Sequence, residues 1–156
     1  MPRYDFAATR LFVPHPLAAG AVVDLERDQS NYILNVLRLR EGDTILVFNG
    51  RDGEWSARIA PGTRKSARLD ISEQARSQQP ACDLHYLFAP IKHARLDYMA
   101  QKAVEMGASK LQPVLTRRTQ VQRVNLERLQ ANAIEAAEQC GIMTIAEVAE
   151  PIDLER

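Results

Sequence analysis

Two basic side chains, Lys92 and Arg118, each come soon after a short apolar run of the sequence. The runs are residues 84–89 and 111–115, and both are typical of buried strands in a parallel sheet. Open α/β sheets place their sites at the carboxyl ends of such strands. We therefore expect Lys92 and Arg118 to lie in a site, where a cation could bind a phosphate or stabilise a developing negative charge.

No other set of residues has the spacing of a familiar catalytic or metal site. The seven glycines form neither a Gly-x-Gly-x-x-Gly nor a P-loop motif. Cys140 continues the apolar stripe of a helix and is expected in the core. We predict no metal site and structural roles for the scattered histidines and cysteines, which are His15, His85, His93, Cys82 and Cys140.

The charges balance overall but are segregated along the chain. Residues 91–123 hold seven basic and two acidic side chains, whereas residues 124–156 hold two basic and seven acidic ones. The basic stretch, together with basic residues of the first half, would suit a nucleic-acid backbone, and a solvated face with internal ion pairs is the alternative. Few aromatic residues lie among these cations, so stacking on single-stranded bases is not predicted. The candidate phosphate contacts are Arg10, Arg38, Arg40, Arg64, Lys65 and Arg117.

The composition is that of a folded protein outside the membrane. Hydrophobic residues make up 46% and charged residues 26% of the 156 residues. No apolar run approaches the ~20 residues that span a bilayer, and no secretory signal is visible. We expect a cytoplasmic protein without a membrane partner.

Five short strands and one helix are predicted in the first half. The strands are residues 11–13, 21–25, 44–48, 54–59 and 67–71, and Asn49–Gly50–Arg51–Asp52–Gly53 predicts a hairpin between the third and fourth. Asp28 is the expected N-cap of the helix, whose apolar residues continue to Leu37. Residues 1–74 are therefore predicted to form a small closed or half-open barrel, and residues 75–81 a linker.

The second half, residues 82–156, has the pattern of an α/β domain. Strand-like runs begin at residues 84, 111 and 143, which are 27 and 32 residues apart, close to the length of a βαβ unit. Helices are expected at residues 94–106 and after Asn125, the predicted N-cap, and they end at Gly107 and Gly141. The prediction for this half is a parallel βαβαβ sheet. The chain as a whole is therefore predicted to have an α+β N-terminal barrel followed by an α/β domain.

Several segments resemble the RsmE family of ribosomal RNA methyltransferases. Gln101–Lys102–Ala103 with Glu105 and Gly107 is similar to the family's "QKA-E-G" pattern, and residues 138–141, Glu-Gln-Cys-Gly, to its "EQCG" pattern. Residues 113–118 resemble its "P…SER" stretch, and residues 36–38 and 47–50 its barrel pattern. Tyr32 stands where the family usually has histidine. The resemblance covers essentially the whole chain.

The resemblance implies a PUA-like RNA-binding barrel followed by part of a SPOUT domain. It implies transfer of a methyl group from S-adenosylmethionine to N3 of a uridine in 16S rRNA, by a homodimer acting on the small ribosomal subunit. Lys92 and Arg118 would then be the catalytic candidates, in contact with RNA phosphate or the uridine anion. Lys102 and Glu105 are expected to pair at i,i+3, and Glu138 and Gln139 to support the site.

One part of the family pattern is missing. The "GPEGG" loop and the later "LG-R-LR-ETA" segment, which belong to the cofactor-binding knot, occur nowhere in the 156 residues. The resemblance therefore implies that the segment that binds S-adenosylmethionine is absent and that the chain alone is inactive. A non-enzymatic RNA-binding module is the alternative.

Overall fold

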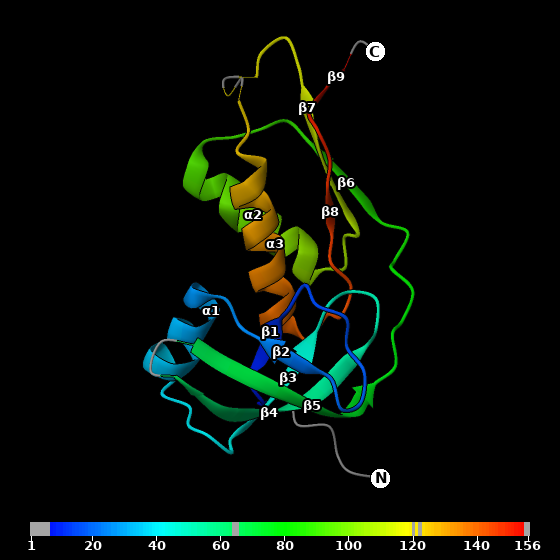
Figure 1. The fold of residues 1–156 in the computed structure, drawn as a ribbon. Helices are drawn as coiled ribbons and strands as arrows, with labels where there is room; N and C mark the ends of the chain where they lie inside the picture. Colours follow the sequence, from blue (N-terminus) through cyan, green and yellow to red (C-terminus); the bar gives the residue numbers. More distant parts are fainter. Residues whose placement is uncertain (1–6, 64–65, 120, 122, 155–156) are drawn as a thin grey trace. The chain divides into compact units, whose positions relative to one another are not determined.

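The computed structural model describes residues 7–63, 66–119, 121 and 123–154. The chain forms two compact units, residues 1–79 and residues 80–156, each with its own sheet (Figure 1). No described helix has both the length and the apolar character needed to cross a membrane.

The first unit is a curled five-stranded mixed sheet, called here the half-barrel. Its strands are β1 (Arg10–Phe12), β2 (Val22–Asp24), β3 (Thr44–Phe48), β4 (Glu54–Thr63) and β5 (Ser66–Arg76), in the order β1-β3-β4-β5-β2. Only the β1–β3 pair is parallel. Alternation along β5 buries Ala67, Leu69 and Ile71, so one face of the sheet packs on the core and the other meets solvent. The predicted half-open barrel is confirmed, and β5 extends to Arg76, into residues 75–81.

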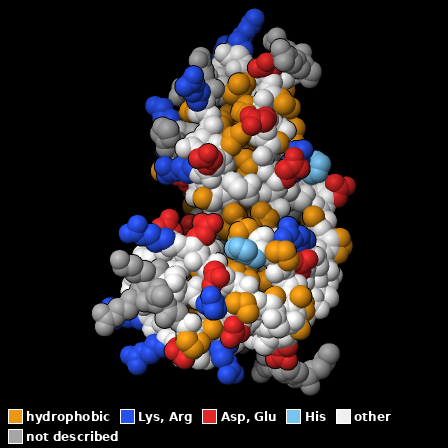
Figure 2. All heavy atoms as spheres, viewed as in Figure 1, with side chains coloured by type: hydrophobic (Ala, Val, Ile, Leu, Met, Phe, Trp, Pro, Cys, Tyr) orange, Lys and Arg blue, Asp and Glu red, His pale blue; other side chains and the backbone are white. Residues whose placement is uncertain are grey.

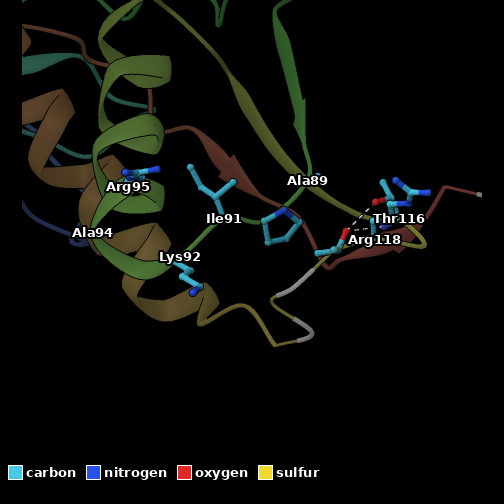
Figure 3. A pocket seen from close by; sticks show the side chains of 9 residues that line it. Ala89, Ile91, Lys92, Ala94, Arg95, Thr116 and Arg118 are labelled. Carbon is cyan, nitrogen blue, oxygen red and sulfur yellow. Dashed lines mark hydrogen bonds between the residues drawn. The ribbon is translucent and has the colours of Figure 1, made fainter.

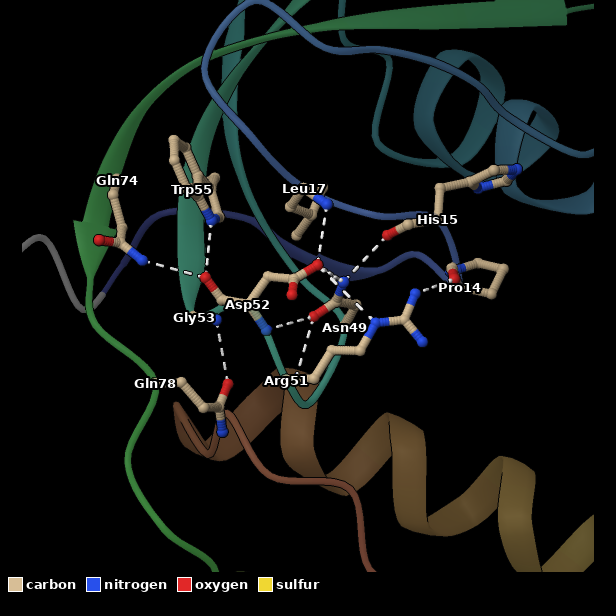
Figure 4. A network of polar contacts seen from close by, with 10 residues as sticks. All are labelled: Pro14, His15, Leu17, Asn49, Arg51, Asp52, Gly53, Trp55, Gln74 and Gln78. Atoms are coloured by element: carbon tan, nitrogen blue, oxygen red, sulfur yellow. Dashed lines mark hydrogen bonds and ion pairs between the residues drawn. The ribbon is translucent and has the colours of Figure 1, made fainter.

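The predicted hairpin joins β3 to β4 and is held by one carboxylate (Figure 4). The Asp52 carboxylate accepts the Leu17 N–H at 2.9 Å and the Asn49 side-chain amide at 2.6 Å. These two hydrogen bonds lower the pKa of Asp52 below its usual range. Gly50 and Gly53 have φ of 84°, which is the conformation that favours glycine. The hairpin therefore fixes the loop that contains Leu17.

The buried carboxylate of Glu54, on β4, contacts arginines of β1 and β5. The Glu54 side chain is fully buried and accepts from Arg10 Nε at 2.5 Å and from Arg76 Nε at 2.8 Å. The Arg10 guanidinium also lies 4.4 Å from the centre of the Phe48 ring, a cation–π contact. Burial raises the pKa of Glu54, but hydrogen bonds from Arg76 and Arg10 outweigh it, and the net pKa is lowered.

The helical segment after β2 changes type along its length. α1 (Arg27–Asn31) begins after Glu26, so the prediction of Asp28 as N-cap is wrong: Asp28 lies in the first turn, where its negative charge faces the helix N-terminus. The next five residues, Tyr32–Val36, form a π-helix, labelled η1 in the element order, and Arg38 follows with a φ of 57°. Ile33 is buried in the core of the half-barrel and anchors the segment.

The second unit is a parallel sheet with two helices packed against each other. Its strands are β6 (His85–Phe88), β7 (Lys110–Leu115), β8 (Glu147–Val148) and β9 (Ile152–Asp153). The order is β6-β7-β8, and β9 also pairs with β7. The predicted parallel sheet is confirmed, although β8 pairs over two residues only. Among the described strands, none pairs with the outer edge of β6.

Helix ends in this unit follow their capping residues. α2 (His93–Glu105) ends before Gly107, whose φ is 96°, and α3 (Leu126–Cys140) ends at Gly141, whose φ is 72°. The Asn125 side chain accepts the Arg128 N–H at 3.0 Å, which confirms this N-cap. The buried stripe of α3 stops at Ala137. Cys140, expected in the core, is exposed, because it lies in the last turn beyond that stripe.

Candidate RNA-binding pocket at the carboxyl ends of β6 and β7

A pocket of about 790 Å³ lies where the chain leaves β6 and β7 (Figure 3). Ala89 directly follows β6, and Thr116 directly follows β7, so the pocket is at the carboxyl ends of two neighbouring parallel strands. This is the expected place for a site in an open α/β sheet. The lining residues are Ala89, Pro90, Ile91, Lys92, Ala94, Arg95, Thr116, Arg118 and Thr119.

Three cations from two walls line this pocket. Lys92 and Arg95 come from the start of α2, and Arg118 comes from the turn after β7 (Figure 3). Of the described residues that line the pocket, none is acidic. The structure thus brings Lys92 and Arg118, singled out from the sequence, to one cavity.

The start of α2 adds partial positive charge to the same pocket. Lys92 is the N-cap, and no side chain caps the helix there. The first turn of α2 also holds no acidic residue, so its N–H groups and dipole are not offset by a carboxylate from that turn. The pocket therefore combines side-chain and backbone groups that favour an anion.

A tight turn after β7 sets the position of Arg118. The Thr116 N–H donates to Thr119 Oγ1 at 2.8 Å, the Thr119 N–H donates to the Thr116 carbonyl at 3.0 Å, and the two hydroxyl oxygens lie 3.0 Å apart. Arg117 and Arg118 are the two central residues of this turn, and both are exposed. The sequence signal for this turn is a threonine at each end of an Arg-Arg pair.

Arg95 is the lining cation that the site prediction omitted. It lies at i,i+3 from Lys92, the N-cap of α2, and both residues line the pocket. That i,i+3 relationship was available in the sequence.

The residues expected to support the site lie elsewhere on α2 and α3. Lys102 Nζ is 2.7 Å from Glu105 Oε2, which confirms the expected i,i+3 pair, and this hydrogen bond raises the pKa of Lys102. Gln139 hydrogen-bonds Glu135 at 3.3 Å within α3, and Glu138 is partly buried. None of Lys102, Glu105, Glu138 and Gln139 is among the described residues lining the cationic pocket.

The basic residues of the half-barrel fall into different environments. Arg10 is 8% exposed and paired with Glu54, so its guanidinium is held inside the unit. Arg38 and Arg40 are exposed. Arg64 and Lys65 lie outside the described residues. Figure 2 shows positive and negative side chains interspersed over the visible face, without a large patch of one sign.

A second pocket, of about 720 Å³, also lies along α2 and is mostly apolar, and it shares Ile91, Ala94 and Arg95 with the cationic pocket. Its lining residues include Tyr86 of β6, Tyr98 and Met99 of α2, and Met106, which directly follows α2. Met106 is 80% exposed and Tyr98 is 63% exposed. Among the described residues, no group of three His, Cys, Asp or Glu side chains could hold a metal ion.

Both units match known protein families. A family model described as an RNA methyltransferase domain matches residues 77–156, about half of the chain. A second, described as an RNA methyltransferase PUA domain, matches residues 25–72.

Curated relatives and a solved structure carry a more specific name. Ribosomal RNA small subunit methyltransferase E of Rickettsia conorii is 32% identical over 136 residues, covering 86% of this chain and 56% of that protein. Its counterpart in Synechocystis is 33% identical over 149 residues, covering 93% and 48%. The chain thus spans about half the length of these relatives.

The structural comparison gives the same result. The crystal structure of ribosomal RNA small subunit methyltransferase E from Neisseria gonorrhoeae, bound to S-adenosyl methionine, is 30% identical and has a TM-score of 0.84. The match covers 94% of this chain and 62% of that one. The chain therefore belongs to the RNA methyltransferase family that includes ribosomal RNA small subunit methyltransferase E.

Proposed function

We propose that this chain is the RNA-binding part of an S-adenosylmethionine-dependent methyltransferase that modifies N3 of a uridine in 16S rRNA. The observation that carries the proposal is the cationic pocket of Lys92, Arg95 and Arg118 at the strand ends. In a family of RNA methyltransferases, a pocket lined by cations and free of acidic lining residues suits the RNA backbone or an anionic base.

The pocket cations have a chemical role in this proposal. Methylation at N3 requires uridine to lose its N3 proton, and negative charge then develops on O2 and O4. Arg118 or Lys92, placed against either oxygen, stabilises that anion and so favours loss of the proton. The α2 N-terminus acts in the same direction.

The same pocket does not fit the methyl donor. S-adenosylmethionine carries a positive sulfonium at its reacting centre, and the lining cations Lys92, Arg95 and Arg118 would repel it. We therefore assign the pocket to RNA.

In this proposal both units of the chain contact RNA. Residues 1–74 would hold RNA on the half-barrel, through Arg38 and Arg40, and residues 82–156 would hold the base to be modified. The partner is 16S rRNA of the small ribosomal subunit in the cytoplasm, and the whole protein works as a homodimer. Arg10 is not carried into this RNA surface, because its guanidinium is paired with buried Glu54.

The test is a binding measurement with 16S rRNA. Arg118→Ala should weaken binding about tenfold, because a hydrogen bond to a charged group is lost. The slope of log affinity against log salt should fall by about one if the lost contact is to a phosphate.

Lys110→Ala is the matched control. Lys110 lies at the opposite end of β7 and pairs with Glu147 at 3.0 Å, so the substitution removes the same charge away from the pocket. Equal effects of the two substitutions would show non-specific attraction and refute the pocket assignment. No binding of 16S rRNA by the wild-type chain would refute the proposed function.

A further inference from the structure

The π-helix of the half-barrel carries exposed apolar side chains that the core does not use. Ile33 is fully buried and fixes the segment, whereas Tyr32 is 41% exposed and Val36 is 61% exposed. Tyr32 and Val36 are four residues apart in an element with more residues per turn than an α-helix, so they lie close to one face. An aromatic ring and a neighbouring aliphatic group are thus presented to solvent together.

The backbone at Arg38, just after the π-helix, has a positive φ, which is unfavourable for a residue other than glycine. The Leu37 N–H donates to the Tyr32 carbonyl at 2.9 Å, and the Leu39 N–H donates to the Ile33 carbonyl at 3.0 Å. Arg38, between these two donors, has a φ of 57° and is the one described non-glycine residue with positive φ. Glycine is the usual residue at such a helix end. Strained non-glycine residues and π-helical turns both cluster at functional sites.

The charged residues between Gln29 and Arg40 are basic, and the acids Asp28 and Glu41 flank this stretch. Residues 29–40 contain Arg38 and Arg40 and no acidic residue. Both arginines are exposed. The carboxylate of nearby Asp43 is occupied by the Arg40 N–H, which donates to it at 2.7 Å. An anionic chain that contacts the exposed ring could therefore also contact Arg38 and Arg40, which follow the π-helix in sequence.

We propose that Tyr32, Val36, Arg38 and Arg40 form a subsite of the half-barrel for single-stranded RNA. An unpaired base stacks on the Tyr32 ring against Val36, and Arg38 and Arg40 bind the phosphates on either side. This inference rests on the proposed function, because it assumes that the ligand is RNA, and it adds a site that reads an unstacked base. Aromatic stacking together with cationic contacts to the backbone is the usual mode for single strands.

Single-stranded RNA is favoured over a double helix for a geometric reason. A ring on one face of a short π-helix can contact only a base that is unpaired and turned outward, because bases in a duplex are stacked on each other. The subsite therefore accounts for the exposure of the Tyr32 ring.

The test measures affinity for a short fluorescein-labelled single-stranded RNA by anisotropy, with the thermal unfolding of each variant measured in parallel. Tyr32→Ala should weaken binding about tenfold, and Tyr32→Phe, which keeps the ring, should bind within about twofold of wild type. Arg38→Gly should weaken binding severalfold without lowering the melting temperature, because glycine accepts the positive φ at this position. Loss of affinity without loss of stability separates binding from folding.

Arg51→Ala is the matched control for charge. Arg51 lies in the hairpin that follows β3, whereas Arg40 lies before that strand, so the two arginines are at opposite ends of it. Arg51→Ala should change affinity less than Arg38→Gly does. Equal effects would overturn the subsite, as would wild-type affinity in Tyr32→Ala. If Arg118→Ala weakens binding and Tyr32→Ala does not, the subsite fails and the proposed function stands; if the wild-type chain binds no RNA, both fail.

Discussion

Replacing Glu54 by glutamine should destabilise the half-barrel by about 3–5 kcal/mol. The carboxylate is fully buried and accepts from two arginines, of which Arg10 has only 5% of its side chain exposed. Glutamine keeps the shape but removes the charge, so the buried Arg10 guanidinium loses the carboxylate that it contacts inside the half-barrel. Arg76 is 28% exposed and can regain water, so most of the loss comes from Arg10.

The single tryptophan of the chain makes this loss measurable. Trp55 follows Glu54 on β4 and packs against the core of the half-barrel, so its fluorescence reports on this unit and not on the other. Urea unfolding followed at Trp55 gives the free energy of unfolding directly. Glu73→Gln, an exposed acid on β5, is the matched control and should change stability by less than about 0.5 kcal/mol.

The same substitution should change the response to acid. The pKa of Glu54 in the folded chain lies below its ordinary value of 4.5, so its ion pairs stabilise the fold above that pH. The stabilisation is lost as the pH falls from 4.5 through the lowered pKa. Glu54→Gln should remove this part of the acid dependence. A loss of less than about 1 kcal/mol in urea, the range of surface ion pairs, would refute the reasoning.

Three further outcomes are expected. Asn125→Ala should destabilise the second unit by about 1 kcal/mol, measured by thermal melting followed by circular dichroism, because the Arg128 N–H loses its acceptor. Gly53→Ala should destabilise the half-barrel in Trp55 fluorescence, since its φ is positive and an added Cβ would meet the Arg76 carbonyl. Calorimetric titration with S-adenosylmethionine should give no saturable heat, because the strand-end pocket is cationic; one-site binding would contradict this.

Local sequence signals predicted the parts of the fold that depend on local contacts. Two glycines in residues 49–53 require positive φ, and the hairpin formed there. α3 begins after Asn125 and ends at Gly141 as expected, because a cap is made with residues of the adjoining helical turn. Spacing of about 30 residues between apolar runs likewise predicted parallel strands. It thereby predicted that Lys92 and Arg118 lie together at the carboxyl ends of these strands.

Contacts distant in sequence could not be predicted in this way. Arg10 was expected to bind RNA, yet its partner Glu54 is 44 residues away, and nothing near either residue indicates the pairing. The apolar spacing after Asp28 predicts a helix but does not distinguish α from π, because both bury Ile33. Cys140 fits a helical stripe, but the length of the core, set by the sheet, decides where the stripe stops being buried.

The open edge of β6 has a consequence for handling the protein in solution. No described strand pairs with the outer side of β6, where Leu87 is 59% exposed, and natural sheets protect such edges with charge or a covering segment. We therefore expect self-association through strand pairing to grow with protein concentration while each copy stays folded. Leu87→Lys puts a charge on that edge and should extend the usable concentration range without altering the melting temperature of the half-barrel.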